Sequence, residues 1–189
     1  MSIAILALQG AFEEHAQMLQ KISVDSVFIR NLADWQAYIS ATDGNRALII
    51  PGGESTAMMR IIRDENLFEP IREAIISGLP VFGTCAGMIM LDDLHLNVMD
   101  IHAKRNAYGR QLGSFSTDHE VEGIGRIPMT FIRAPYIESI GPDAKVLSVL
   151  DGNIICAQQG KMLVCSFHPE LTQDERMHRY FVEMVKKSE

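Results

Sequence analysis

Cys85 is the residue of this chain best suited to nucleophilic chemistry. It lies inside the pentapeptide Gly83-Thr-Cys-Ala-Gly87, between an apolar run, Pro80 to Thr84, and a second apolar stretch. This pattern has the form of a nucleophile elbow with cysteine in place of serine, and the start of the helix that follows favours the thiolate. A buried structural thiol is the alternative interpretation of the same residues.

His168 and Glu170 form the second candidate element. They lie in Cys165-Ser-Phe-His-Pro-Glu170, directly after another apolar run. Pro169 disfavours helix at His168, and residues two apart in an extended segment project to one side, so the two side chains are expected to point together. A histidine oriented by a carboxylate is the partner that a cysteine nucleophile needs. Alone, either residue would more often be a solvated surface group.

The third element is the segment Ile50-Pro-Gly-Gly-Glu-Ser-Thr56, where a strand end runs into a helix start. Its consecutive glycines expose backbone N–H groups, and we assign an oxyanion hole to the N–H groups of Gly53 and Ala86. A capped loop or a phosphate site is the alternative, although the segment lacks the Lys-Ser/Thr of a P-loop. The presence of the other two elements favours the oxyanion interpretation.

The first half of the chain predicts the strands and helices that would position these elements. Short runs typical of strands buried on both faces lie at 3–8, 24–29, 47–50 and 80–84. Helical patterns lie at 12–22, around 33–40, at 55–64 with Ser55 as N-cap, and at 67–77. Alternating strands and helices predict a mainly parallel sheet with helices on both faces, whose sites form at the carboxyl ends of the strands.

The second half of the chain has a different pattern. From about residue 112, short β-like runs at 114–121, 129–132, 146–150, 154–157 and 162–166 are separated by turn residues. Asp151-Gly152-Asn153 and Gln159-Gly160-Lys161 are typical of hairpin connections. An amphipathic helix is expected over 175–187. The predicted fold class is α/β, with a mainly parallel central sheet and an antiparallel extension.

Composition excludes several classes of protein. The 189 residues are 47% hydrophobic and 22% charged, which predicts one domain over residues 1–189 and excludes disorder and collagen-like repeats. A net charge of −7 gives no general attraction to nucleic acid or anionic lipid. The N-terminal apolar run stops at Gln9-Gly10, too short for a signal sequence or a membrane span, so a cytoplasmic protein is expected.

The remaining cysteines and histidines are not expected to do chemistry. Cys156 and Cys165 lie in apolar runs as core thiols, and three cysteines without CxxC spacing support neither a disulfide framework nor a zinc site. No metal site is expected, because no ligand spacing links the other histidines: His15, His95, His102, His119 and His178.

Across its whole length the chain resembles the class I (triad) glutamine amidotransferases, and among them the glutaminase subunits of pyridoxal 5′-phosphate synthase. The resemblance is carried by LALQGAFEEH, PGGEST, FGTCAG, RNAYGRQ, FIRAP and CSFHPELT. It implies the three-layer, flavodoxin-like α/β fold of that family and hydrolysis of L-glutamine to L-glutamate and ammonia through a γ-glutamyl thioester. It also implies that no cofactor is needed and that the ammonia passes to a separate synthase subunit.

The resemblance implies a role for each site residue. Cys85 would be the nucleophile, His168 the general base and then acid, and Glu170 the orienting partner of His168. The residues implied in glutamine binding are Gly53, Glu54, Ser55, Arg110, Ile132 and Arg133.

Several alternatives stay open at the level of sequence. An arginine suits a substrate carboxylate because its planar fork binds two oxygens, but Arg110 and Arg133 would otherwise form surface ion pairs. Gln9 and Gly10 are predicted as an activation switch next to the oxyanion hole, with a plain turn as the alternative. For the whole chain, a cysteine peptidase or DJ-1-like enzyme and an inactive flavodoxin-like regulatory module are the competing interpretations.

Overall fold

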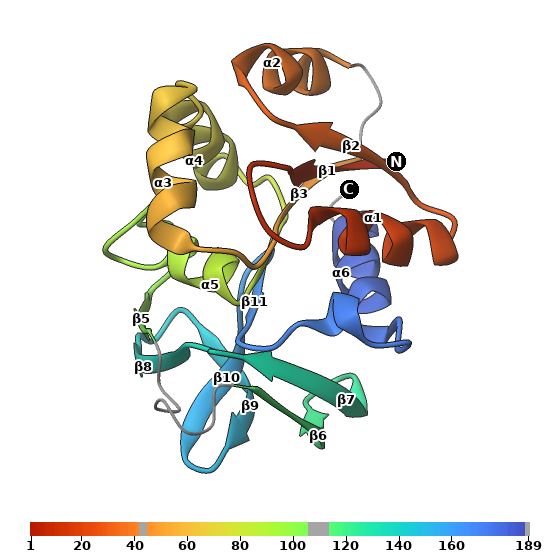
Figure 1. Ribbon diagram of the computed structural model, residues 1–189, viewed down its shortest axis with the longest axis vertical. Helices are drawn as coiled ribbons and strands as arrows, with labels where there is room; N and C mark the ends of the chain where they lie inside the picture. The colour runs from red at the N-terminus through yellow and green to blue at the C-terminus, as the bar shows by residue number, and fades with distance from the viewer. Residues whose placement is uncertain (42–44, 106–113, 188–189) are drawn as a thin grey trace.

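A computed structural model of the chain describes residues 1–41, 45–105 and 114–187 (Figure 1). Its strands are β1 (Ser2–Leu6), β2 (Asp25–Ile29), β3 (Arg46–Ile50), β4 (Val81–Thr84), β5 (Ile101–Lys104), β6 (Ser114–Val121), β7 (Gly125–Ile132), β8 (Tyr136–Ile140), β9 (Lys145–Leu150), β10 (Asn153–Gln159) and β11 (Met162–Cys165). Its helices are α1 (Phe12–Lys21), α2 (Leu32–Ser40), α3 (Ser55–Asp64), α4 (Phe68–Ile76), α5 (Ala86–Leu91), the 3₁₀ turn η1 (Pro169–Leu171) and α6 (Arg176–Lys186).

The main sheet confirms the predicted α/β architecture. Its nine strands follow the order β2-β1-β3-β4-β11-β10-β8-β5, with β9 paired to β10. The first five strands of this order are parallel, and the others join as antiparallel neighbours. Strands β6 and β7 form a separate two-stranded hairpin. The carboxyl ends of β4 and β11, which precede two of the candidate elements, therefore lie side by side.

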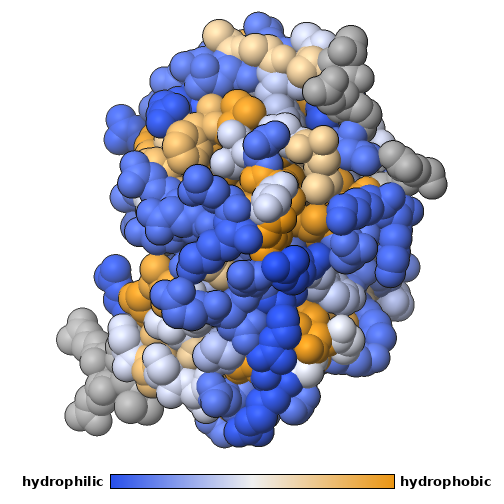
Figure 2. All heavy atoms as spheres, turned by 90° about the vertical axis from the view of Figure 1, so that its right-hand side faces the viewer, coloured by the Kyte–Doolittle hydropathy of each residue, from blue (hydrophilic) through white to orange (hydrophobic). Residues whose placement is uncertain are grey.

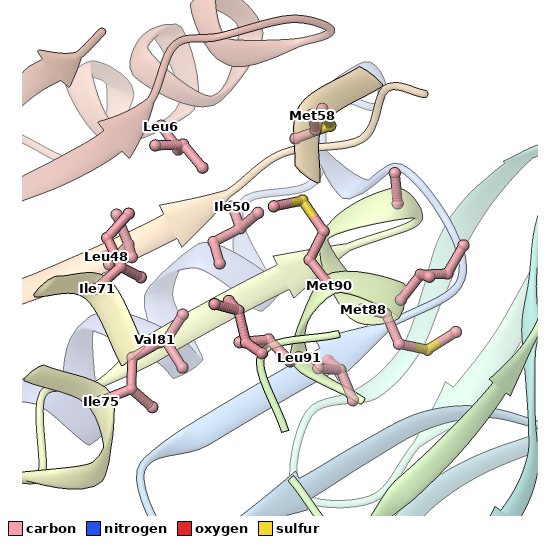
Figure 3. Close-up of a cluster of buried hydrophobic side chains, with 14 of the residues drawn as sticks. Leu6, Leu48, Ile50, Met58, Ile71, Ile75, Val81, Met88, Met90 and Leu91 are labelled. Atoms are coloured by element: carbon pink, nitrogen blue, oxygen red, sulfur yellow. The ribbon is translucent and has the colours of Figure 1, made fainter. Parts of the chain in front are cut away.

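The central strands are apolar along their whole length because both faces of the sheet are covered. Leu48 and Val81 pack with α2, α3, α4 and α5 in one core cluster, part of which is drawn in Figure 3. Ile49 and Phe82, one position further along each strand, pack with α1, α6 and the β6–β7 hairpin in a second cluster. All four side chains are fully buried. The strands thus fix the candidate elements to a rigid layer.

The antiparallel part departs from the expected pattern in two places. Strands β5 and β8 were not predicted, and they pair with each other at the end of the sheet. Each is short and partly exposed, so neither shows a continuous apolar run or a clean alternation. Both predicted hairpins are confirmed, with Asp151 and Gly152 at positive φ between β9 and β10 and Gly160 at positive φ between β10 and β11.

The predicted N-cap of α3 is wrong by one residue. Ser55 is the first residue of the helix and is buried, whereas Glu54 is the cap. The Glu54 carboxylate accepts hydrogen bonds from the N–H groups of Ala57 at 2.7 Å and Thr56 at 3.0 Å. These bonds lower the pKa of Glu54. A glutamate replaces the expected serine because its longer side chain reaches the same orphan N–H groups.

The face of the molecule in Figure 2 is mostly hydrophilic, and its hydrophobic residues form small separated areas. This agrees with the net charge of −7. Among the described residues, no helix is long and apolar enough to cross a membrane.

Candidate active site

Cys85 lies on the turn between β4 and α5, as the elbow pattern predicts. Its backbone has φ +50° and ψ −107°, a conformation that L residues rarely adopt and that is typically kept at functional sites. The turn is fixed by a hydrogen bond from the Cys85 N–H to the Cys165 carbonyl, 2.8 Å away. Gly87 lets α5 approach β3, because a Cβ there would overlap the Ile50 carbonyl oxygen. The strained turn places Cys85 in the wall of a cavity at the carboxyl end of β4.

His168 follows β11, the strand next to β4 in the sheet. Its N–H donates to the Thr130 carbonyl of β7 at 2.8 Å, and its Nδ1 lies 2.7 Å from Glu170 Oε1. The two side chains point together as predicted, but η1 rather than an extended segment brings them there. Burial disfavours the imidazolium, but hydrogen bonds to Cys85 and Glu170 outweigh it and raise the pKa of His168 to about 10. His168 therefore holds a proton between the thiol and the carboxylate.

The Gln9-Gly10 turn contacts the Pro-Gly-Gly-Glu-Ser loop. Gln9 Oε1 accepts a hydrogen bond from the Glu54 N–H at 3.2 Å, and the Ala11 N–H donates to the Gly52 carbonyl at 3.4 Å. Gly10 has φ +85°, and a Cβ there would overlap that Gly52 oxygen. The two loops are close enough that a shift of one peptide must move the other.

A cavity of about 610 Å³ joins these elements. Beside Cys85 and His168, its walls include all the predicted glutamine and oxyanion residues that the structure describes: Gly53, Glu54, Ser55, Ala86, Ile132 and Arg133. Gln9 and Gly10 line it as well. Arg110 lies outside the described residues, so its predicted place is not tested.

Arg105 is a cavity residue that the sequence pattern did not single out. Its Nη1 donates to Thr56 Oγ1 at 2.9 Å, which holds the guanidinium near the start of α3. Arg105 opens the RNAYGRQ segment that contains Arg110. The segment as a whole indicated an arginine in the substrate pocket, but the spacing of its two arginines does not tell which of them lines the cavity.

The other thiols and one acidic group lie away from this cavity. Cys156 and Cys165 are fully buried opposite each other on β10 and β11, and burial raises the pKa of both. This confirms them as core thiols. Asp92, Asp93 and His102 bring ligand atoms within 4.8 Å of one another; the Asp92 oxygens are hydrogen-bonded to Leu94, His95 and Ala103, and Asp93 Oδ1 pairs with His102 itself.

Comparison with solved structures defines the class of protein. A crystal structure described as a glutamine amidotransferase has a TM-score of 0.88 and 38% identity, covering 97% of this chain and 98% of its own. A glutamine amidotransferase from Thermotoga maritima shares the fold, with a TM-score of 0.59 at 15% identity. The match covers 98% of this chain and 84% of that one. The fold is that of the class I glutamine amidotransferases.

Sequence comparison narrows the class to a family. The model of the SNO glutamine amidotransferase family matches residues 5–187, and the chain belongs to this family. Pyridoxal 5′-phosphate synthase subunit PdxT of Streptococcus pneumoniae strain CGSP14 is 56% identical, covering 99% of this chain and 98% of that protein. The corresponding protein of strain D39 is 55% identical, covering 99% of both chains.

Proposed function

We propose that this chain hydrolyses L-glutamine to L-glutamate and ammonia, with Cys85, His168 and Glu170 as its catalytic triad. The observation that supports this most directly is a strained elbow cysteine beside a histidine whose Nδ1 lies 2.7 Å from a buried carboxylate. That arrangement, in a member of a glutamine amidotransferase family, fits attack on a carboxamide. Neither a peptidase nor an inactive regulatory module is favoured by a specific feature of the site.

The proposed reaction has two halves. Cys85 Sγ attacks the side-chain carbonyl carbon of glutamine, the C–N bond breaks, and His168 donates the proton with which ammonia leaves. A water molecule then attacks the γ-glutamyl thioester, with His168 as the base, which releases glutamate and restores the thiol. The N–H groups of Gly53 and Ala86 would stabilise the oxyanion of both tetrahedral intermediates. No step needs a cofactor or a metal.

We also propose how the cavity binds glutamine. Arg105 is the described arginine placed to pair with the substrate carboxylate on the α3 side, and Arg110 stays a prediction for the same role. Ser55, Ile132 and Arg133 complete the pocket. Each Glu54 carboxylate oxygen accepts one hydrogen bond from the α3 N-terminus. Because each oxygen has a second lone pair, the carboxylate can also accept from the substrate amino group.

The proposed partner is a separate pyridoxal 5′-phosphate synthase subunit that accepts the ammonia. The PdxT relatives are described as subunits of that synthase and match this chain over 98–99% of their length, which supports a partner subunit for this chain as well. We propose a cytoplasmic hetero-oligomer without nucleic acid or membrane partners. We propose that residues 1–189 act as one glutaminase domain and that partner docking sets the Gln9-Gly10 switch.

The test is glutamate release from saturating glutamine, measured with the chain alone and with the synthase subunit. We expect slow or no release alone and a clear increase with the subunit. Equal rates would contradict activation by the partner, and no release in either assay would contradict the glutaminase function. Mass spectrometry of the Cys85 peptide after treatment with a glutamine-like electrophile tests the nucleophile separately.

A further inference from the structure

Behind Glu170 lies a pair of buried histidines that the proposed reaction does not use. His15 of α1 and His178 of α6 are both fully buried, and His15 Nδ1 lies 2.9 Å from His178 Nε2. The other ring nitrogen of His15, Nε2, lies 3.1 Å from Thr84 Oγ1 and 3.5 Å from Glu170 Oε2. One imidazole nitrogen thus faces both the residue before the nucleophile and the carboxylate that holds His168.

Both histidines are neutral in the folded protein. Burial lowers the pKa of His178 to about 3, and burial with the neighbouring His178 and His168 lowers the pKa of His15 well below its usual value. A neutral imidazole has one N–H donor and one acceptor nitrogen. The short His15–His178 contact therefore carries a single proton, and its position fixes the tautomers of both rings.

The two tautomer arrangements differ in what they leave unpaired. If His15 carried its proton on Nδ1, its Nε2 lone pair would face both the Thr84 hydroxyl, which could donate to it, and the Glu170 carboxylate, and the proton of His178 would sit on Nδ1. His178 Nδ1 is buried without a hydrogen-bond partner among the described residues. An N–H donor buried without a partner and a lone pair facing a carboxylate are both unfavourable.

The opposite arrangement removes both problems. His178 then donates its Nε2–H to His15 Nδ1, and His15 directs its Nε2–H toward Thr84 Oγ1 and Glu170 Oε2. Only an acceptor nitrogen of His178, Nδ1, is then left unpaired among the described residues. Glu170 Oε2 has no hydrogen-bond partner among the described residues and lies 3.5 Å from His15 Nε2, whereas Oε1 pairs with His168 Nδ1.

We propose that His15 is a positioning residue for the triad: its Nε2–H holds Glu170, and His178 fixes the tautomer that makes this donation. The expected effect of His15 on catalysis rests on the proposed function, whereas the proposed tautomers and the donation to Glu170 do not. Without the donor, Glu170 Oε2 would lose the nitrogen that lies 3.5 Å from it, and the buried carboxylate would be free to turn. His168 would then lose the partner that orients its ring.

The first experiment reads the tautomers directly in the intact chain. Ring ¹⁵N spectra of the histidine-labelled protein, assigned with His178→Leu, report which nitrogen of each ring carries a proton. We expect His15 and His178 to be protonated at Nε2 and bare at Nδ1. Protonation of His15 at Nδ1 would overturn the proposal. This readout does not depend on glutamine hydrolysis, so it separates the inference from the proposed function.

The second experiment uses a matched pair of variants, assayed with the synthase subunit. His15→Gln places an amide near the Nε2 position and His15→Asn places one near Nδ1, so both remove the ring and keep a donor. We expect the glutamine variant to keep kcat within about threefold, and the asparagine variant to lose about tenfold. KM for glutamine stays unchanged, since His15 does not line the cavity. Equal losses in the two variants would contradict the proposal.

The Glu170→Gln background is the control for mechanism. If His15 acts through Glu170, His15→Asn changes kcat less than about twofold once the carboxylate is gone. A full tenfold loss in that background would show that His15 acts elsewhere. Phe181→Leu, which removes a ring packed against Phe82 in the same core, is the control for stability and is expected to lower the melting temperature while leaving kcat unchanged.

Discussion

The two sides of His168 are built differently. On one side lie Cys85 and a cavity of about 610 Å³ whose walls include the exposed Glu54. On the other side lie Glu170 and His15, whose exposed fractions are 5% and 0%. The cavity side is formed by loops at strand ends and is open to ligand, whereas the buried side is formed by helix and strand packing. Substitutions on the cavity side should change turnover or glutamine binding, and those on the buried side should change turnover and stability together.

The largest effect is expected on the cavity side. Cys85→Ser should lower kcat by about 10⁴-fold or more, because the hydroxyl is a far weaker nucleophile, while the melting temperature stays close to that of the wild type. Glutamate release and a thermal melt measure the two quantities. Cys156→Ala and Cys165→Ala are the controls, and they should lower stability while turnover per folded molecule is kept. Wild-type turnover in folded Cys85→Ser would remove this residue from the triad.

Moving from Cys85 toward the buried side, the loss should become smaller. His168→Asn should lower kcat by about 10⁴-fold, since it removes the group that transfers protons. Glu170→Gln should cost less, about 10²- to 10³-fold, because Glu170 orients His168 and transfers no proton itself. Turnover of both variants under saturating glutamine checks this order. A fully active Glu170→Gln enzyme would break the proposed triad.

Gly10→Ala tests whether the two loops of the cavity side act together. A Cβ at residue 10 would overlap the Gly52 carbonyl oxygen, so the loop that carries Gly53 must shift and kcat should fall by about 10²-fold, the effect of losing one oxyanion donor. Gly78→Ala is the matched control, because Gly78 also has positive φ but meets nothing within 4 Å. It should cost stability only. Equal kcat in the two variants would contradict the switch.

Arg105→Lys should raise KM for glutamine by about tenfold with little change in kcat, because a point charge replaces a planar fork. The matched variant Arg110→Lys tests the prediction made from sequence for the second arginine of the same segment. Steady-state kinetics with varied glutamine distinguishes the two. An unchanged KM in Arg105→Lys would exclude this residue from carboxylate binding.

The smallest effect concerns the buried side alone and is a pH dependence of stability. The pKa of His178 is about 3 in the folded chain and near 6.5 when unfolded, so below pH 6.5 the unfolded state binds more protons. Stability therefore falls as pH drops from about 6.5 toward 3, with a slope of up to about 1.4 kcal/mol per pH unit for one proton. The buried side is thus sensitive to acid.

Urea unfolding at pH 7 and pH 5 measures this slope. His178→Leu should be less sensitive to acid than the wild type by up to one proton. His168 has the opposite sign, because its raised pKa gives a stabilisation that is complete below about pH 6.5 and lost as pH rises toward 10. An unchanged acid slope in His178→Leu would show that His178 is not a buried neutral group in the folded protein.

Residue order along the chain was enough to predict the parts of the site that depend on local geometry. Cys85 lies between two apolar runs, so a strand end and the following turn fix its position. His168 and Glu170 are only two residues apart, so the local backbone brings their side chains together. The same local signals predicted the parallel sheet, both hairpins and two core thiols. The N-cap of α3 was misplaced by one residue, because a glutamate and a serine satisfy the same N–H groups.

The meeting of distant side chains depends on the packed fold instead. Strands β5 and β8 form by pairing with each other, which no local pattern encodes strongly. Arg105 lines the cavity through its contact with Thr56, 49 residues away. His15 and His178 are 163 residues apart, and they meet because α1 and α6 cover the same face of the sheet. Burial makes both rings neutral, and burial is a property of the packed layers that spacing along the chain does not specify.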